Sequence, residues 1–586
     1  MENENRNLIL AMVLSVLVML GWYTFFAPEE LKNPPEVVAE QSAAATAAIE
    51  APTTIVDVET ALSQSERVII DTPTIGGSIN LTGGNLDNLT LHNYKETKDV
   101  NSPDVEVLFP NGTENAYFTE TGFAAIEGTD PAAVPTSADA WTLKSGDKLT
   151  PMTPVVMTWK SPTGVNYERE FSVDENYMFT VKDRVTNNST SPITLQPLAF
   201  VTHKGEPENN GTYVLHEGAI RNSDGVVEDL KFKAIRGADN VGGGVFMDKV
   251  NVENKGWVGF TTKYWMTVIA PENDTPFLSV LRYNEGADTY AAGGFFNAEK
   301  IAVGATIEKT VQIFAGAKEV KLVREYEKAL GIDRFDDTVD WGWFYFLTKP
   351  IFTLLHWLYS VIGNMGLAII ALTFCIKTIL FPLAYRSFVS MSKMKKLQPQ
   401  MEKIKEAAGD DRTKLQQATM ELYKKEKVNP VSGCLPIILQ IPIFFSLYKV
   451  LYVTTELRHA PFFGPWQDLS VGDPTSILNL FGLLPWGVPG PESFFAIISL
   501  GILPLLLGIS MWLTQKLNPT PQDPTQKMIF TWMPWVFMFM MGSFATGLIL
   551  YWITNNMLTF IQQYTIMRSQ GVKVDLFDNM LGRNKT

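Results

Sequence analysis

Five apolar segments fill the C-terminal half of this 586-residue chain and constrain its fold more than any other feature. A helix of about 20 predominantly apolar residues is long enough to cross the hydrocarbon core of a bilayer. Segments near this length, the fourth of them shorter, lie at residues 366–385, 430–452, 494–513, 528–541 and 545–566. The sequence therefore predicts a helical membrane core of five transmembrane helices within residues 365–567.

A sixth apolar run, residues 8–26, follows a single arginine near the N-terminus. Because the apolar part of a cleaved secretory signal is only about 7–15 residues long, the run predicts an uncleaved signal-anchor helix over residues 1–27. The alternative is cleavage in the alanine-rich stretch 43–48, which lies well beyond the run. Residues 28–54 are rich in Pro, Ala and Glu, a composition that predicts a flexible linker.

Residues 55–340 have a different texture, with short segments that alternate apolar and polar side chains between clusters of Gly, Asn, Asp and Pro. This pattern predicts a large all-β domain of antiparallel strands, a supersandwich. The segment contains no Gly-rich phosphate loop, nucleophile elbow or metal-binding cluster, and carboxylates such as Asp183 and Glu206 are expected on the solvated surface. The two cysteines, Cys375 and Cys434, both lie in apolar segments, so the β domain can hold no disulfide.

The segment 341–364 is aromatic and amphipathic, and Lys349 and Pro350 interrupt it. Tryptophan and tyrosine favour the headgroup layer of a membrane, so we expect an interfacial helix that leads into the membrane core. A fully spanning helix is the alternative, although His356 also opposes it.

The charges of the loops predict the orientation. Residues 386–427 carry eleven positive and six negative side chains, a balance of +5, whereas Arg458 is the only positive residue of 454–493. The positive-inside rule places the +5 loop and the C-terminus in the cytosol. Six spans then place the N-terminus there as well, and the β domain lies outside, in the periplasm of a bacterium. The net charge of −14 argues against nucleic acid as a direct partner.

The cytosolic loop 386–429 is itself patterned as a helical hairpin. Met391, Met394 and Met401 recur on one face of a helix, the stretch 407–411 interrupts it, and a second helix follows. The methionines could form an adaptable docking surface for apolar segments or the seam between the two helices. The sequence leaves both interpretations open.

Lys377 lies inside the apolar segment 366–385, where a cation costs about 3 kcal/mol on insertion scales. Its side chain could snorkel toward the cytosolic end, about 12 Å away, or it could face a polar cavity. Further polar or helix-breaking residues lie in the later spans: Pro436, Gln440, Pro442, Pro534, Thr554, Asn555 and Asn556. They form either a simple interhelical hydrogen-bond network or a hydrated recess. Because the spans contain no carboxylate, they lack the usual machinery of a proton-coupled carrier.

Five motifs follow one another between residues 339 and 567: VDWGWFYFLTKP, TFCIKTILFPLAYRSFVSMSKMKKLQPQ, VNPVSGCLPIILQIPIFFSLYKVL, ELRHAPF and GLILYWITNNMLTFIQQ. Together they resemble the YidC family of membrane-protein insertases. The preceding anchor and large β domain resemble the Gram-negative branch of that family, whose periplasmic domain is a β supersandwich like that of sugar mutarotases.

The resemblance implies roles for individual residues. Lys377 matches a positive residue that lies in a groove open to the cytosol and to lipid, although most members carry arginine there. Thr373 and Trp552 match positions important for function, Trp552 in place of a tyrosine, and Gln440 and Asn555 are expected in the same groove. The substrate slide is expected to contain Pro436, Ile441, Pro442, Phe444, Pro534 and Met540.

The chain is accordingly predicted to be an insertase and folding factor of the bacterial inner membrane, not an enzyme, with no cofactor and no metal. The resemblance implies nascent membrane proteins, the Sec translocon, ribosome–nascent-chain complexes and the lipid bilayer as partners. The short cytosolic tail, residues 568–586, lacks the long basic extension of some relatives. The alternatives are a polytopic secondary transporter, which would need coupling-ion ligands, and a membrane-tethered sugar-binding protein.

Overall fold

The structure is a computed structural model, and it describes residues 55–572 apart from 100, 127, 208–214, 410, 427, 429–434, 489–497 and 520–523. The expected anchor 1–27, the whole linker 28–54, Cys434 and residues 573–586 of the tail lie outside the described residues.

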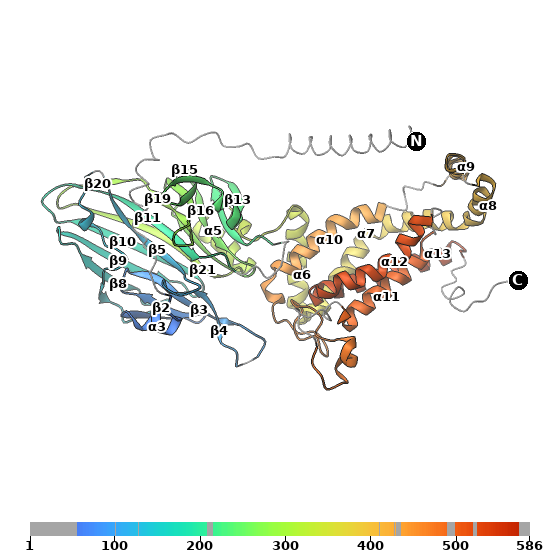
Figure 1. Cartoon of the computed structure of the whole chain (residues 1–586), viewed down its shortest axis with the longest axis horizontal. Coiled ribbons are helices and arrows are strands. Elements are labelled where there is room, and N and C mark those ends of the chain that lie inside the picture. Colours follow the sequence, from blue (N-terminus) through green and yellow to red (C-terminus); the bar gives the residue numbers. More distant parts are fainter. Residues whose placement is uncertain are drawn as a thin grey trace. The chain divides into compact units, whose positions relative to one another are not determined.

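The described part of the N-terminal half is built from β strands in three sheets (Figure 1). A five-stranded sheet has the order β4-β3-β2-β1-β7 and contains β1 (Arg67–Asp71), β2 (Ile75–Asn80), β3 (Asn85–Lys95), β4 (Asp104–Leu108) and β7 (Lys148–Leu149). Its strands pair antiparallel except for β1 and β7, which are parallel.

A nine-stranded sheet has the order β13-β12-β16-β17-β21-β10-β9-β8-β6. Its strands are β6 (Thr142–Ser145), β8 (Val155–Lys160), β9 (Val165–Val173), β10 (Met178–Asn187), β12 (Gly218–Ser223), β13 (Val226–Leu230), β16 (Gly256–Thr261), β17 (Trp265–Pro271) and β21 (Thr306–Ala317). The third sheet contains β5 (Tyr117–Ile126), β11 (Ile193–Lys204), β14 (Asp239–Gly242), β15 (Val245–Val252), β18 (Phe277–Asn284), β19 (Thr289–Phe296) and β20 (Glu299–Ile301).

The three sheets share one apolar core, which makes the domain sandwich-like. Ile79 and Leu89 of the five-stranded sheet, Phe179 and Phe314 of the nine-stranded sheet, and Leu281 of the third belong to a single cluster of buried side chains. Among the described residues of the domain there are also three short α-helices, α3 (Val58–Ser63), α4 (Phe232–Arg236) and α5 (Val320–Leu330). The prediction of an all-β domain with alternating strands is therefore confirmed.

Strand β9 shows how alternation builds this core and where it fails to predict a partner. Every second residue from Val165 to Val173 is buried, and one of these inward positions is Arg169. Its Nε and Nη2 donate to Asp183 Oδ1 and Oδ2 at 2.6 and 2.8 Å, because β10 pairs with β9 in a register that sets the two residues opposite each other. The expectation that Asp183 lies on the solvated surface was therefore wrong. Glu206 does lie at the surface, beside Arg236.

The C-terminal half is helical (Figure 1). Helix α6 (Tyr345–Ile362) occupies most of the segment expected at the membrane interface. It ends at Gly363, whose φ of 75° is the left-handed conformation that glycine tolerates, and the Asn364 side chain then accepts from the Leu367 backbone N–H. These two residues end α6 and begin α7 (Met365–Lys396) without an intervening loop.

Helix α7 has 32 residues, or about 48 Å, so it extends beyond a hydrocarbon core of about 30 Å. The expected boundary at residue 386 therefore falls within a continuous helix, and Met391 and Met394 lie on α7 itself. After α7, the short helices α8 (Gln398–Ala408) and α9 (Arg412–Lys425) form the rest of the hairpin.

The methionines of the hairpin form a seam. Met391, Met394 and Met401 are buried together with Leu422 of α9 and Ile566 near the end of the last helix. Of the two interpretations left open by the sequence, the structure favours a seam over an exposed docking surface.

Four further α-helices follow within the described residues: α10 (Leu435–Val453), α11 (Ile502–Leu517), α12 (Pro524–Met540) and α13 (Thr546–Ser569). Helix α13 packs against α7 and α11, and α11 also packs against α12. Within the described residues, α7 alone is both long and apolar enough to cross a membrane by length and composition. The apolar helix α11 and residues 440–453 of α10 are shorter.

Candidate functional site

A cavity of about 610 Å³ lies among helices α7, α10, α11, α12 and α13. One wall is polar and comes mainly from α13, and the other is apolar and comes from α7, α10, α11 and α12 together with Trp552 of α13. The polar wall consists of Lys377, Gln440, Thr514, Asn518, Tyr551, Asn555, Asn556, Thr559, Gln562 and Gln563. We call this cavity the groove.

Lys377 lines the groove from α7 and is half-buried. Its Nζ donates to Oγ1 of Thr559 on α13 at 2.9 Å, and Thr559 Oγ1 in turn donates to the Asn555 backbone carbonyl at 2.6 Å. Within the described part of the chain, no carboxylate lies within salt-bridge distance of Lys377. The cation therefore has a neutral partner that fixes its position without neutralising its charge.

The polar wall arises because polar residues recur at helical spacing on α13. Residues 555, 559 and 562 are separated by four and three positions and so lie along one face of the helix. Asn556 Nδ2 donates to Ser510 Oγ at 3.1 Å, and Gln563 Nε2 donates to Asn518 Oδ1 at 3.0 Å. These two amides join α13 to α11 and its end.

Gln440 closes one side of the groove. Its Nε2 donates to the Tyr551 hydroxyl at 2.7 Å, a contact that joins α10 to α13. Polar side chains buried in an apolar surrounding are stabilised when they find such partners. The sequence pointed to Gln440 but gave no indication of Tyr551.

Aromatic side chains form the apolar wall around Trp552. Its ring meets Phe444 of α10 edge-on at 4.9 Å and lies nearly parallel to Phe537 of α12 at 6.1 Å. Ile441 and Phe445 of α10 also line the groove and are 49% and 50% exposed. This wall is therefore accessible from outside the bundle, where lipid chains would surround α10.

The structure does not bring every predicted residue to the groove. Thr373 is 1% exposed, and its hydroxyl donates to the Ile369 carbonyl within α7 at 2.7 Å. Among the residues expected on the slide, Ile441 and Phe444 line the groove, whereas Pro534 is buried within α12 and Met540 is 51% exposed at its end. Pro442 is half-buried within α10.

Pro436 lies in the first turn of α10, where the side chains are outside the described residues. Sequence reasoning missed Thr559, Gln562 and Gln563. Their spacing of four to eight residues from Asn555 was the signal that could have identified them.

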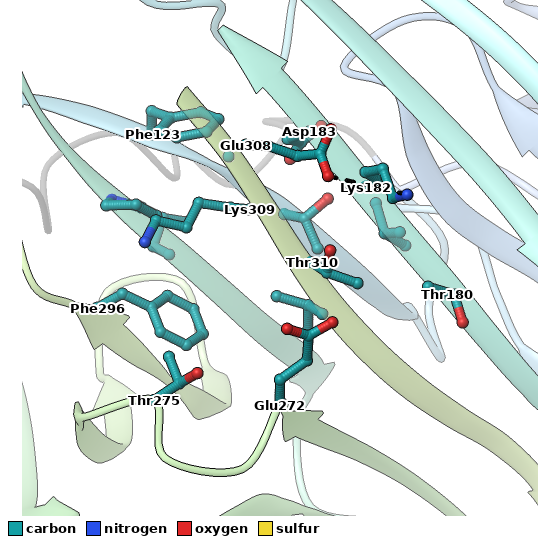
Figure 2. Close-up of a pocket in the computed structure, with 16 residues that line it drawn as sticks. Phe123, Thr180, Lys182, Asp183, Glu272, Thr275, Phe296, Glu308, Lys309 and Thr310 are labelled. Carbon is teal, nitrogen blue, oxygen red and sulfur yellow. Dashed lines mark ion pairs between the residues drawn. The ribbon is translucent and has the colours of Figure 1, made fainter. Parts of the chain in front are cut away.

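A second cavity, of about 440 Å³, lies in the β domain between strands β5, β10 and β21 (Figure 2). Both of its lysines and two of its three carboxylates have partners of opposite sign. Lys182 lies 3.8 Å from Glu308, Lys309 pairs with Glu299, and Asp183 accepts from Arg169. Paired charges leave this cavity without the free cation that distinguishes the groove.

Comparisons with known proteins cover the whole chain. Residues 67–354 match the family model "YidC periplasmic domain", and residues 357–573 match the model "60Kd inner membrane protein". A curated relative from Dinoroseobacter shibae, "Membrane protein insertase YidC", is 51% identical over 100% of this chain and 99% of its own length. A relative of the same name from Roseobacter denitrificans is 50% identical over 99% of this chain and 98% of its own length.

Among solved structures, an active YidC insertase whose crystal structure resolves the first transmembrane domain covers 95% of this chain and 99% of its own. Its sequence identity with the chain is 18%, and the TM-score is 0.36.

Proposed function

Since the chain belongs to the YidC family of membrane protein insertases, we propose that its groove receives the polar segment of a membrane protein during insertion. The protein is a membrane insertase of the inner membrane with a periplasmic β domain, and it is not an enzyme. Its substrates are membrane proteins.

The proposed route follows from the two walls of the groove. The polar tail of a substrate enters along α13 and lies beside Lys377, while its apolar helix slides past Ile441 and Phe444 into lipid. The groove shortens the hydrocarbon distance that the tail must cross, and a cation in a low-dielectric recess attracts an acidic tail. Burial of the apolar helix in lipid drives the reaction, because transferring apolar surface out of water is favourable.

The observation that carries this proposal is the neutral contact of Lys377 with Thr559. A cation whose partner is a hydroxyl keeps its charge available to a ligand, whereas a carboxylate partner would neutralise that charge within the protein. The family resemblance implies arginine at this position in most members, and lysine differs from it because its ammonium lacks the planar fork of five donors. A point charge that already donates to Thr559 should select acidic tails by charge rather than by shape.

We propose the following domain order and membrane topology for the whole chain. Residues 1–27 anchor the N-terminus, 28–54 form a linker, 55–340 form the periplasmic domain, and 341–364 lie at the membrane interface. The membrane core 365–567 contributes five spans to a total of six. Both termini are cytosolic, as the positive charges of residues 386–427 favour. The Sec translocon and ribosome–nascent-chain complexes are proposed partners, with the charged hairpin of α8 and α9 as their contact.

The test compares matched substrates that differ only in one tail residue, Asp or Asn, in cells that rely on one variant of the insertase. Lys377→Arg should keep insertion of both substrates. Lys377→Ala should lower insertion of the Asp-tailed substrate by about tenfold, the scale of one hydrogen bond to a charged group, and affect the Asn-tailed substrate less. Equal insertion of both substrates by Lys377→Ala and wild type, at equal protein levels, would remove the role of the cation.

A further inference from the structure

We infer that the groove contains a second subsite, formed by the side-chain amides of Asn555 and Gln562, that hydrogen-bonds the peptide groups of a substrate's polar tail. The inference deepens the proposed function and rests on it. Lys377 would select the charge of the tail, and the two amides would hold its backbone irrespective of sequence.

The first support is position. Asn555, Thr559 and Gln562 lie at positions i, i+4 and i+7 of α13, which is one face of a helix, and all three line the groove. Asn555 and Gln562 are about 10 Å apart along the helix axis. The Lys377 ammonium, held by Thr559, lies at the position between them.

The second support comes from the hydrogen bonds of the four side-chain amides that α13 contributes to the polar wall. Asn556 and Gln563 donate to Ser510 and Asn518, so they act in helix packing. By contrast, the Asn555 side-chain oxygen is buried without a hydrogen-bond partner within the described residues. The Gln562 side chain makes no hydrogen bond to any other part of the chain that the structure describes. Buried polar groups are rarely left without partners, so an orphan amide beside a cavity points to a ligand.

The chemistry of a carboxamide fits a peptide group. Each amide has one carbonyl acceptor and an NH₂ donor, and a peptide group offers the matching N–H and C=O. A half turn of the Asn555 amide exchanges its oxygen and nitrogen, so either end can be presented to the groove. An extended chain advances about 3.3 Å per residue, so amides about 10 Å apart address peptide groups about three residues apart. An acidic residue between those two peptide groups would then lie beside Lys377.

The alternative is that all four amides serve packing alone. In that case Asn555 and Gln562 would be expected to contact a neighbouring helix as Asn556 and Gln563 do. A packing role and a substrate role also differ in what they predict for substrates. Only the substrate role makes insertion depend on the N–H groups of the tail.

The experiment uses the full-length insertase and a single-span substrate with an uncharged tail, in two forms whose tail contains three alanines or three prolines. Proline has no backbone N–H, so its tail cannot donate to the amides. Wild type should insert the alanine tail about fivefold better than the proline tail, the scale of one hydrogen bond. The double variant Asn555→Leu/Gln562→Leu should lose that preference, because its alanine tail falls to the level of the proline tail.

Two controls separate this inference from the proposed function. The swap Asn555→Gln/Gln562→Asn keeps both carboxamides and should restore a preference for the alanine tail. Lys377→Ala should lose the preference for acidic tails and keep the preference for alanine over proline. If Lys377→Ala has no effect but the leucine variant loses the alanine preference, the cation proposal fails and the amide subsite stands.

An unchanged alanine-to-proline ratio in the leucine variant would overturn the inference. Should the double leucine variant fail to accumulate, the single variants Asn555→Ser and Gln562→Ser carry the same measurement. They keep a small polar side chain on α13 while removing the amide. A ratio equal to that of wild type in both serine variants would likewise exclude the subsite.

Discussion

The β domain holds a buried cation and the groove a half-buried one, and the surroundings of the two cations differ in charge. Arg169 is 1% exposed, forms two hydrogen bonds with Asp183, and also donates to the backbone carbonyls of Gly84 and Thr121. The Lys377 ammonium donates a hydrogen bond to the Thr559 hydroxyl, and no carboxylate of the described residues lies within salt-bridge distance of it. The charge of Arg169 is neutralised by a carboxylate of the same domain. Lys377 is positioned by a neutral hydroxyl, so its charge remains available to a ligand.

This difference separates a structural charge from a functional one. The charges of a buried ion pair neutralise each other, so neither is available to a ligand. Removing one member leaves the other as an unpaired charge in a medium of low dielectric constant. A cation whose partner is neutral destabilises an apolar helical bundle. Such a residue therefore indicates a functional role, here the binding of a charged ligand. The same contrast holds for the β-domain cavity of Figure 2, where Lys182 and Glu308 face each other.

The largest expected effect on stability concerns Arg169. Arg169→Met leaves Asp183 as an uncompensated buried charge and should lower the free energy of unfolding of the β domain by about 3–5 kcal/mol. Pulse proteolysis of the detergent-solubilised full-length protein in urea measures this change. The matched control is Arg184→Met on the neighbouring strand β10, whose half-exposed side chain pairs with Glu168 and Glu308, so its loss should lower the free energy of unfolding far less than the loss of Arg169. Equal losses in the two variants would contradict the account of Arg169.

The same substitution in the groove should act in the opposite direction. Lys377→Met removes a cation and leaves no buried charge behind, since Thr559 still donates to the Asn555 carbonyl. Thermal unfolding of the purified protein should therefore occur at the same temperature as in wild type or higher, although insertion of acidic tails falls. A loss of stability comparable to that of Arg169→Met would show that Lys377 is a structural residue.

A smaller effect is expected for a third cation, Lys318, which directly follows strand β21 of the β domain. Its Nζ donates to Thr261 and to the Thr262 carbonyl, and burial lowers its pKa from 10.5 to about 8, with Asp340 acting in the opposite sense. Between pH 8 and 10.5 the unfolded chain therefore binds more protons than the folded one at this site, so the contribution of Lys318 makes stability rise with pH.

Lys318→Met should abolish that contribution, which for one proton is at most about 1.4 kcal/mol per pH unit. The measurement is the urea midpoint of the full-length protein at several pH values, wild type against variant. Parallel curves for the two proteins would show that Lys318 stays charged in the folded state.

Local patterns predicted the elements well, because periodicity is a property of neighbouring residues. The alternation of apolar and polar side chains within residues 55–340 predicted strands with one buried face, which β9 shows, and the apolar segments predicted the helices of the C-terminal half. The motifs between residues 339 and 567 also identified the family, as the relatives confirm.

Partners across elements could not be predicted in this way. Asp183 was assigned to the surface because its partner Arg169 is 14 positions away, and only the register of β9 with β10 brings the two together. Thr559 was missed because its contact with Lys377 spans 182 positions and depends on how α7 packs against α13. The continuity of α7 through residue 386 was likewise hidden, because a charged surface replaces the apolar one without breaking the helix.

The central claim is that the Lys377 charge acts on the charge of the substrate tail, and a charge reversal tests it most directly. Insertion is measured for matched substrates whose tail carries Asp or Lys, in cells that rely on wild type or on Lys377→Glu. The account predicts that wild type favours the Asp tail and that Lys377→Glu favours the Lys tail, inserting it better than wild type does. If Lys377→Glu lowers insertion of both substrates by the same factor at equal protein levels, the groove does not read the charge of the tail and the account is wrong.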